Sequence, residues 1–318
     1  MDIRHWTLTA AVISGALIGC ADSSPPPVAG AGDSVAVTFR EAAWAPKREK
    51  DIPGDSMGAS IKRGLYLLRF TPESLPEYAT SNLRCTSCHQ DDGIRPTSGP
   101  LTGSHARFPK YMPRSGTVIA LADRVNYCFT RSLSGNAIPV GSREMIDILA
   151  YLAFISADIP VGTKIAGADG LIAMPDTLDG DVSRGEALYA SKLCVTCHGP
   201  DGAGNGPIPP LWGAKSYSVG ASMSRIERAA SFIKHNMPQT SPGSLTAQES
   251  FDLSAFINSH PRPDSPGKER DWPMGGAPAD VPYETKGHVA FRPPPVLPRA
   301  TPTRALWPNP AAISRAKP

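Results

Sequence analysis

The chain has 318 residues, of which 41% are hydrophobic, and its formal net charge is +3 at pH 7. This length allows about two domains of ordinary size. So small a net charge provides no broad basic field, so nothing in the composition indicates a nucleic-acid partner. Any preference for anions must therefore come from individually placed arginines.

The first 20 residues have the pattern of an export signal. Arg4 and His5 precede a mostly apolar run over 6–18, which is too short for a permanent membrane-spanning helix and is typical of a secretory signal. The run ends in Leu-Ile-Gly before Cys20, which resembles a lipobox, in which the cysteine is acylated. We expect a periplasmic protein anchored to a membrane by lipid at Cys20, and Ala21 weakly favours the outer membrane. Cleavage nearby without lipidation is the alternative.

Two Cys-x-x-Cys-His motifs occupy 85–89 and 194–198. This spacing lets two thiols form thioethers to one porphyrin while the histidine ligates its iron. One such motif alone could be a redox dithiol or half of a zinc site, but two copies in an exported chain favour two covalently bound haem c groups. The expected thioether cysteines and proximal iron ligands are Cys85, Cys88, Cys194 and Cys197, with His89 and His198.

Each motif is followed at the same distance by a sulfur that could be the sixth iron ligand. Cys128 comes 39 residues after His89, and Met237 comes 39 residues after His198. A methionine followed by proline is a neutral ligand that raises haem potential, so the second haem is expected to pass electrons on. Core packing of Met237 is the alternative, and Lys234 or His235 could compete as ligand.

Cys128 predicts a different kind of haem site. The chain has six cysteines, of which one is expected to carry lipid and four to form thioethers. Cys128 is the one that remains, so we expect no structural disulfide. A thiolate ligand lowers haem potential, which makes a poor electron outlet and indicates another purpose. On a helix, Arg124 and Ser132 would lie on the face of Cys128, lower its pKa and offer donors to an oxyanion. A buried inert cysteine is the alternative.

The chain is expected to be all-α, with two class I cytochrome c-like domains in tandem, an unstructured tether and a Pro-rich tail. Helices are predicted over 117–133 in the first domain and 224–236 in the second. The tail is expected to be disordered or to wrap the surface in extended form. The predicted segments are a signal peptide (1–20), a tether (21–45), the first domain (46–164), a linker (165–181), the second domain (182–262) and the tail (263–318).

The sequence over 124–135, Arg-Val-Asn-Tyr-Cys-Phe-Thr-Arg-Ser-Leu-Ser-Gly, resembles the dihaem thiosulfate dehydrogenases, as do Tyr-Met-Pro-Arg at 111–114 and Ile-Lys-His-Asn-Met-Pro at 233–238. The resemblance covers roughly residues 60–262. It implies an active site at a His/Cys-ligated first haem and electron transfer by a His/Met-ligated second haem. Some members of that family have a lysine directly before the distal methionine, and it can replace the methionine as ligand. This chain has Asn236 at that position, so the resemblance does not imply redox-linked ligand exchange at the second haem. The residues that the resemblance assigns to the active site are Cys128 as catalytic ligand, Arg114 and Arg124 as substrate-binding arginines, and Ser132 as the hydroxyl.

The resemblance further implies that two thiosulfate ions are joined into tetrathionate, or the reverse. Electrons would leave to a small c-type cytochrome or another periplasmic acceptor. One alternative is the haem subunit of a sulfur-oxidation enzyme that conjugates thiosulfate to a carrier protein, against which Met237 argues. The other is a plain lipid-anchored electron-transfer cytochrome, against which the combination of Cys128, Arg124 and Ser132 argues.

Overall fold

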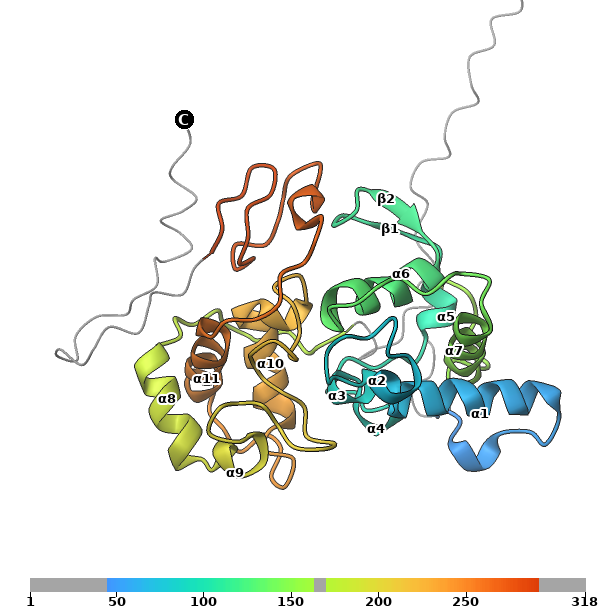
Figure 1. Cartoon of the computed structure of the whole chain (residues 1–318), viewed down its shortest axis with the longest axis horizontal. Helices are drawn as coiled ribbons and strands as arrows, with labels where there is room; N and C mark the ends of the chain where they lie inside the picture. Colours follow the sequence, from blue (N-terminus) through green and yellow to red (C-terminus); the bar gives the residue numbers. More distant parts are fainter. Residues whose placement is uncertain (1–44, 163–169, 292–318) are drawn as a thin grey trace, which may run out of the picture. The chain divides into compact units, whose positions relative to one another are not determined.

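The structure is a computed structural model, and it describes residues 45–162 and 170–291. The described residues are mainly helical and contain one two-stranded antiparallel sheet, so the expected all-α pair of tandem cytochrome c-like domains is confirmed (Figure 1). The signal peptide with Cys20, nearly all of the tether, part of the linker and residues 292–318 lie outside the described ranges.

Each domain contributes its own set of helices. In the first domain these are α1 (Ser56–Arg69), α2 (Thr71–Ser74), α3 (Cys85–Cys88), α4 (Gln90–Gly93), α5 (Ser104–Arg107), α6 (Leu121–Tyr127) and α7 (Arg143–Phe154), preceded by the short η2 (Glu49–Asp51). In the second domain they are α8 (Val182–Ser191), α9 (Cys194–His198), α10 (Ile226–Asn236) and α11 (Ala247–Ser259), with η4 (Ser222–Ser224) before α10.

Within the described ranges, none of the helices combines the length and the apolar character that crossing a bilayer requires.

A glycine marks the helix crossing on which each domain is built. In the first domain α1 packs on α7, and in the second α8 packs on α11 (Figure 1). A Cβ atom on Gly64 would lie 2.0 Å from the backbone oxygen of Asp147, and one on Gly185 would lie 2.1 Å from that of Asp252. Only glycine lets the two backbones approach this closely.

The arginine before each glycine binds the same buried aspartate. Arg63 Nε and Arg184 Nε each donate at 2.8 Å to an oxygen of Asp147 and Asp252, respectively. Both carboxylates are almost fully buried, and a buried charge requires a partner. The Arg-Gly dipeptide that precedes each Cys-x-x-Cys-His motif therefore serves the same geometry in both domains, a close helix contact beside a carboxylate paired with arginine.

The helix expected over 117–133 is wrong at its beginning. Residues 117–119 form β2 (Thr117–Ile119), which pairs with β1 (Lys110–Met112). Three β-branched residues in a row favour an extended strand over a helix. The helix α6 begins only at Leu121, and it continues as η3 (Cys128–Ser132), a π-helical turn in which Leu133 N donates to Cys128 O at 2.8 Å.

The first part of the tail, 263–291, has a small core. It contains η5 (Lys268–Arg270) and an apolar cluster of Trp272, Val281 and Tyr283, against which Val219 packs. The two aromatic rings and the valine supply enough apolar surface for this cluster, although the high proline content of the tail gave no indication of a core. These residues therefore belong to the folded molecule.

Candidate active site

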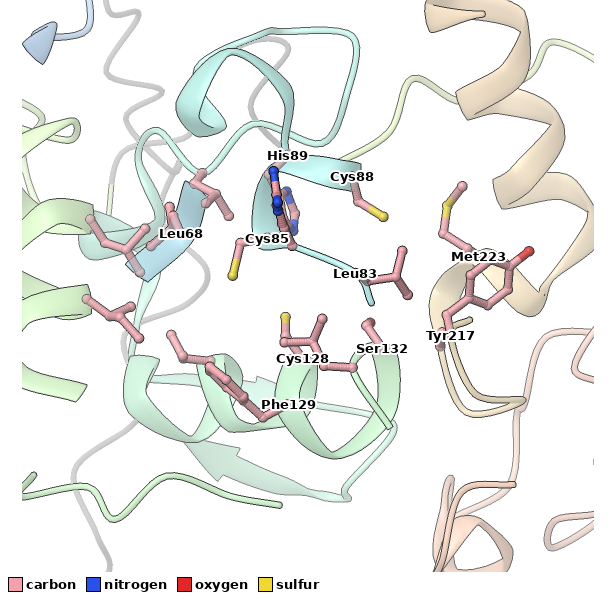
Figure 2. A pocket seen from close by; sticks show the side chains of 17 residues that line it. Leu68, Leu83, Cys85, Cys88, His89, Cys128, Phe129, Ser132, Tyr217 and Met223 are labelled. Carbon is pink, nitrogen blue, oxygen red and sulfur yellow. The ribbon is translucent and has the colours of Figure 1, made fainter. Parts of the chain in front are cut away.

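An apolar cavity in the first domain contains the side chains of its Cys-x-x-Cys-His motif. Its volume is about 720 Å³, including space open to solvent, which is within the range of sites that enclose a cofactor. In Figure 2, His89 and Cys128 approach the cavity from opposite walls, and Ser132 lies on the Cys128 side. The apolar lining includes Leu68, Leu83, Leu101, Val125, Phe129, Leu133, Ile148 and Leu152.

The proximal histidine is held in one orientation. His89 follows α3, and its Nδ1 donates to the backbone oxygen of Gly99 at 2.5 Å. This bond commits Nδ1 and leaves Nε2 as the nitrogen available to a metal, which is the usual arrangement for a ligating histidine. The loop after the motif therefore orients the histidine that is predicted to bind the iron.

Cys128 stands at the junction of α6 and the π turn η3. Such turns are rare and concentrate at functional sites, because the extra residue per turn redirects side chains. Arg124 Nη1 lies 3.2 Å from Cys128 Sγ, so the guanidinium expected beside this cysteine is there. Ser132 also lines the cavity.

Electrostatics separates Cys128 from the other two cysteines of the cavity. Burial raises the pKa of the Cys85 and Cys88 thiols to about 12. Burial also acts on Cys128, but the Arg124 guanidinium and His89 outweigh it and lower its pKa to about 6. Of these three sulfurs, Cys128 is thus the one whose thiolate form the neighbouring charges favour, which suits a nucleophile or a thiolate ligand.

Arg114 is placed apart from this group. Its Nε donates to Asp271 Oδ2 at 2.9 Å, its Nη2 donates to Gly220 O at 2.6 Å, and its guanidinium covers the ring of Trp272 at 4.9 Å. It is not among the residues that line the cavity. The structure therefore places Cys128 and Ser132 on the cavity wall and Arg124 against the Cys128 sulfur, although Arg124 is not itself among the lining residues. Arg114 is tied to the tail, and its contact with substrate stays a prediction.

The second half of the chain closes the first cavity, which the sequence did not reveal. Tyr217, Ala221 and Met223 line it, and Figure 2 shows Tyr217 and Met223 at its side. Tyr217 is buried under the guanidinium of Arg262, 4.3 Å from the ring centre. These residues precede α10 without apolar periodicity, so no pattern in the sequence assigns them to a haem site in the other domain.

The second domain repeats the proximal arrangement. His198 Nδ1 donates to the backbone oxygen of Pro209 at 3.0 Å, and burial lowers the pKa of this histidine, which favours the neutral form that binds metal. Met237 directly follows α10, and it packs with Cys194 against the core of this domain. Cys197 is exposed.

The two competitors of Met237 have their own partners. Lys234 Nζ donates to the backbone oxygens of Gly243 and Leu245 at 2.9 and 2.5 Å. His235 Nδ1 donates to Ser231 O at 2.8 Å, in the manner of a helix side chain bound to its own turn. The ammonium would have to give up both carbonyl contacts to reach an iron atom, which argues against Lys234. The bond of His235 involves Nδ1 alone, as that of His89 does, and does not argue against ligation through Nε2, so Met237 as the ligand stays a prediction.

The donor sets fit haem c. In each domain the chain presents two cysteines, a histidine held through Nδ1 and a sulfur residue beyond it, and in the first domain these surround an apolar cavity. Among residues 45–162 and 170–291, no group of three or more His, Cys, Asp or Glu side chains could hold a metal ion by itself. The fold and the sites define a c-type cytochrome with two covalently bound haems.

Comparison with known proteins narrows this class. The SoxA/TsdA cytochrome c domain family matches residues 77–161, and the cytochrome c family matches residues 182–261. The thiosulfate dehydrogenase of Psychrobacter arcticus is 37% identical over 239 residues, covering 73% of this chain and 72% of the relative. That of Allochromatium vinosum is 39% identical over 222 residues, covering 67% and 82%. The chain belongs to the thiosulfate dehydrogenase family and is an oxidoreductase.

A solved structure has the same fold. The "as isolated" form of thiosulfate dehydrogenase TsdBA from Marichromatium purpuratum superimposes with a TM-score of 0.65 at 30% identity. The match covers 71% of this chain and 51% of that one, so the chain spans about half the length of that protein.

Proposed function

We propose that the protein oxidises two thiosulfate ions to tetrathionate at Cys128. The observation that carries the proposal is the 3.2 Å contact between Arg124 Nη1 and the sulfur of Cys128, a residue that lines the apolar cavity of the first domain. A cytochrome that only carries electrons needs no guanidinium on its ligand, whereas a sulfur nucleophile that meets an anionic substrate does. The names of the relatives support the same substrate.

The reaction has two sulfur–sulfur bond steps. First, the Cys128 thiolate and the outer sulfur of one thiosulfate lose two electrons together and form a Cys–S–S–SO₃⁻ adduct. Second, the outer sulfur of another thiosulfate attacks the adduct, which releases tetrathionate and restores the Cys128 thiolate. The haems, when bound, supply the acceptors for the two electrons. Run backwards, the same steps reduce tetrathionate.

The side chains around Cys128 make the encounter of two dianions possible. At about 4 Å their mutual repulsion is on the order of 4 kcal/mol even in bulk water, and it is larger in an apolar cavity. Arg124 supplies a positive charge at the reacting sulfur, and Ser132 supplies a hydroxyl donor on the same wall. Arg114 would join them only by exchanging its contact with Asp271 for one with an oxyanion.

The second domain is the electron outlet in this proposal. Met237 as a thioether ligand would hold its haem at a higher potential than a thiolate-ligated haem, so electrons run from the first domain to the second. The acceptor would be a small c-type cytochrome or another periplasmic electron carrier. Acylation of Cys20 would anchor the whole chain to a membrane in the periplasm, as Leu-Ile-Gly-Cys at 17–20 indicates.

One further candidate function has a specific observation in its favour. The family that matches the first domain includes SoxA as well as TsdA, so conjugation of thiosulfate to a carrier protein uses the same kind of domain. The methionine that follows α10 in the second domain supports the dehydrogenase instead, because it provides an electron outlet within the same chain.

Product analysis tests the proposal. The haem-loaded protein is mixed with thiosulfate and an artificial electron acceptor, and tetrathionate and reduced acceptor are quantified. We expect one tetrathionate for each two electrons and no product from haem-loaded Cys128→Ala. Acceptor reduction without tetrathionate would contradict the proposal and favour the conjugating enzyme or the carrier.

A further inference from the structure

The tail inserts a buried carboxylate between two arginines of the first domain. Asp271 is 3% exposed. Arg131 donates to it through Nη1 and Nη2 at 2.6 and 2.5 Å, and Arg114 Nε donates at 2.9 Å. The hydroxyl of Tyr283 donates to Oδ2 of the same carboxylate at 2.7 Å. Four donors thus converge on one side chain that lies outside both haem motifs.

Arg131 links this carboxylate to the catalytic turn. It belongs to η3, three residues after Cys128 and directly before Ser132. Its guanidinium lies over the ring of Tyr127 at 5.1 Å, while its backbone oxygen accepts from the hydroxyl of Ser218 at 2.5 Å. Arg131 is therefore held at both its side chain and its main chain, in a turn whose backbone bonds are π-helical rather than α-helical.

A second link runs through the β1–β2 hairpin. Arg114 follows β1, and its backbone oxygen accepts from Trp272 N at 2.8 Å. Tyr283 also bonds the guanidinium of Arg114. The tail segment thus holds Arg114 by main chain and side chain at once.

The charges at this junction do not cancel. Two guanidinium groups face one carboxylate, and the further titratable group in contact with it is the Tyr283 phenol, whose pKa burial raises to about 12. Loss of the carboxylate would leave two largely buried cations without a counter-ion, which is strongly unfavourable. The arginines would have to move to reach water or another anion.

We propose that Asp271 is a positioning residue of the active site. It fixes Arg131, and through Arg131 the π turn that presents Cys128 and Ser132 to the haem cavity. Asp271 itself touches neither substrate nor sulfur. The role in turnover rests on the proposed thiosulfate chemistry, whereas the role in placing Cys128 does not.

Asp271→Asn in the full-length, haem-loaded protein tests the proposal. Asparagine keeps the shape and removes the charge. The matched control is Asp264→Asn, in the same segment, because Asp264 is largely exposed and its partners, Lys268 and the backbone N of Ser265, belong to the tail itself. The readouts are haem content, the electron paramagnetic resonance spectrum of the thiolate-ligated ferric haem, and kcat and KM for thiosulfate.

For Asp271→Asn we expect full haem loading, a thiolate signal that splits into several species, and kcat/KM lowered about tenfold or more through kcat. Asp264→Asn should match the parent protein in all three. Tyr283→Phe keeps the Asp271 charge and removes one of its hydrogen-bond donors, so it should show a smaller change of the same kind. It is the test variant if Asp271→Asn does not fold.

Other results would overturn the inference. An unchanged spectrum and kcat/KM within twofold in the Asp271 or Tyr283 variant would mean that the junction only holds the tail. A lower KM at unchanged kcat would mean that Asp271 competes with the substrate for the arginines. If the parent protein does not oxidise thiosulfate, the proposed function fails, and the spectrum still decides whether Asp271 positions Cys128.

Discussion

Asn236 and Thr97 bind each other through two hydrogen bonds. Thr97 Oγ1 donates to Asn236 Oδ1 at 2.7 Å, and Asn236 Nδ2 donates to Thr97 O at 3.0 Å, with the amide fully buried. Asn236 directly precedes Met237, and Thr97 lies two residues before Gly99, whose carbonyl oxygen accepts from His89. The pair thus connects the segment of Met237, the predicted distal ligand of the second haem, with the loop that follows the first Cys-x-x-Cys-His motif.

Removing the hydroxyl of Thr97 should test how much this pair stabilises the molecule. Thr97→Val leaves the buried Oδ1 of Asn236 without its donor, which costs about 1–3 kcal/mol of unfolding free energy. Thr97→Ser keeps the donor and is the control. Urea unfolding of the haem-loaded proteins measures both, and an unfolding free energy of Thr97→Val equal to that of the parent would show that the hydrogen bond contributes nothing.

Replacing Met237 should change one haem potential and leave the other. Met237→Gly removes the thioether, and the potential of the second haem should fall, because the neutral soft donor that raises it is gone. Met174→Leu is the control, since Met174 packs in the same apolar cluster. Redox titration followed at both haems is the measurement. If Met237→Gly fails to fold while its folded fraction keeps native haem spectra, Met237 is a packing residue.

The sequence predicted which side chains the structure places at the first cavity, namely the motif residues and Cys128. Their roles as ligands stay predictions. The proximal histidines follow from the motifs, and the contact of Arg124 with Cys128 follows from helical spacing. The π turn was not predictable from the sequence. It adds one residue to a single helical turn, and the spacing of the apolar residues over 117–133 fits a regular α-helix almost equally well. Asp271 was hidden for another reason: its partners are 140 and 157 residues away, in a tail whose composition resembles a linker.

The two arginines of the first domain should behave differently. Arg124→Ala removes a charge-assisted contact at the reacting sulfur, and kcat/KM for thiosulfate should fall about 30- to 150-fold. Arg114→Ala should in addition free the tail, since it breaks the bonds to Asp271 and Tyr283. Steady-state kinetics with limited proteolysis separates the two effects. If the tail of Arg114→Ala resists protease as well as the tail of the parent protein does, Arg114 does not hold the tail in place.

The glycines at the two helix crossings should not tolerate a side chain. Gly64→Ala and Gly185→Ala each force a Cβ onto a backbone oxygen, and the resulting shift should cost about 1–3 kcal/mol or more. Gly141→Ala is the control, because open space surrounds that position. Thermal melting followed at the haem absorption should show lower midpoints for the first two alone. A Gly64→Ala midpoint equal to that of Gly141→Ala would mean that the crossing is looser than described.

Cys128→Ala should change the potential of the first haem and should also abolish thiosulfate oxidation. Loss of an anionic sulfur donor should raise that potential, and the second haem should keep its own. Turnover of thiosulfate should disappear, because the other two cysteines at the cavity, Cys85 and Cys88, are used in the thioethers to the haem and cannot form the sulfur–sulfur adduct. Redox titration and tetrathionate formation are measured on protein whose haem content equals that of the parent.

Ser132→Ala provides the comparison for Cys128→Ala. It lies on the same wall of the cavity and loses a donor while the nucleophile remains, so it should slow turnover without abolishing it. Near-normal turnover in fully loaded Cys128→Ala would mean that thiosulfate gives up its electrons without a covalent link. Arg124 would then serve to bind an anion near a haem edge, and the electron-carrier interpretation of this chain would become the stronger one.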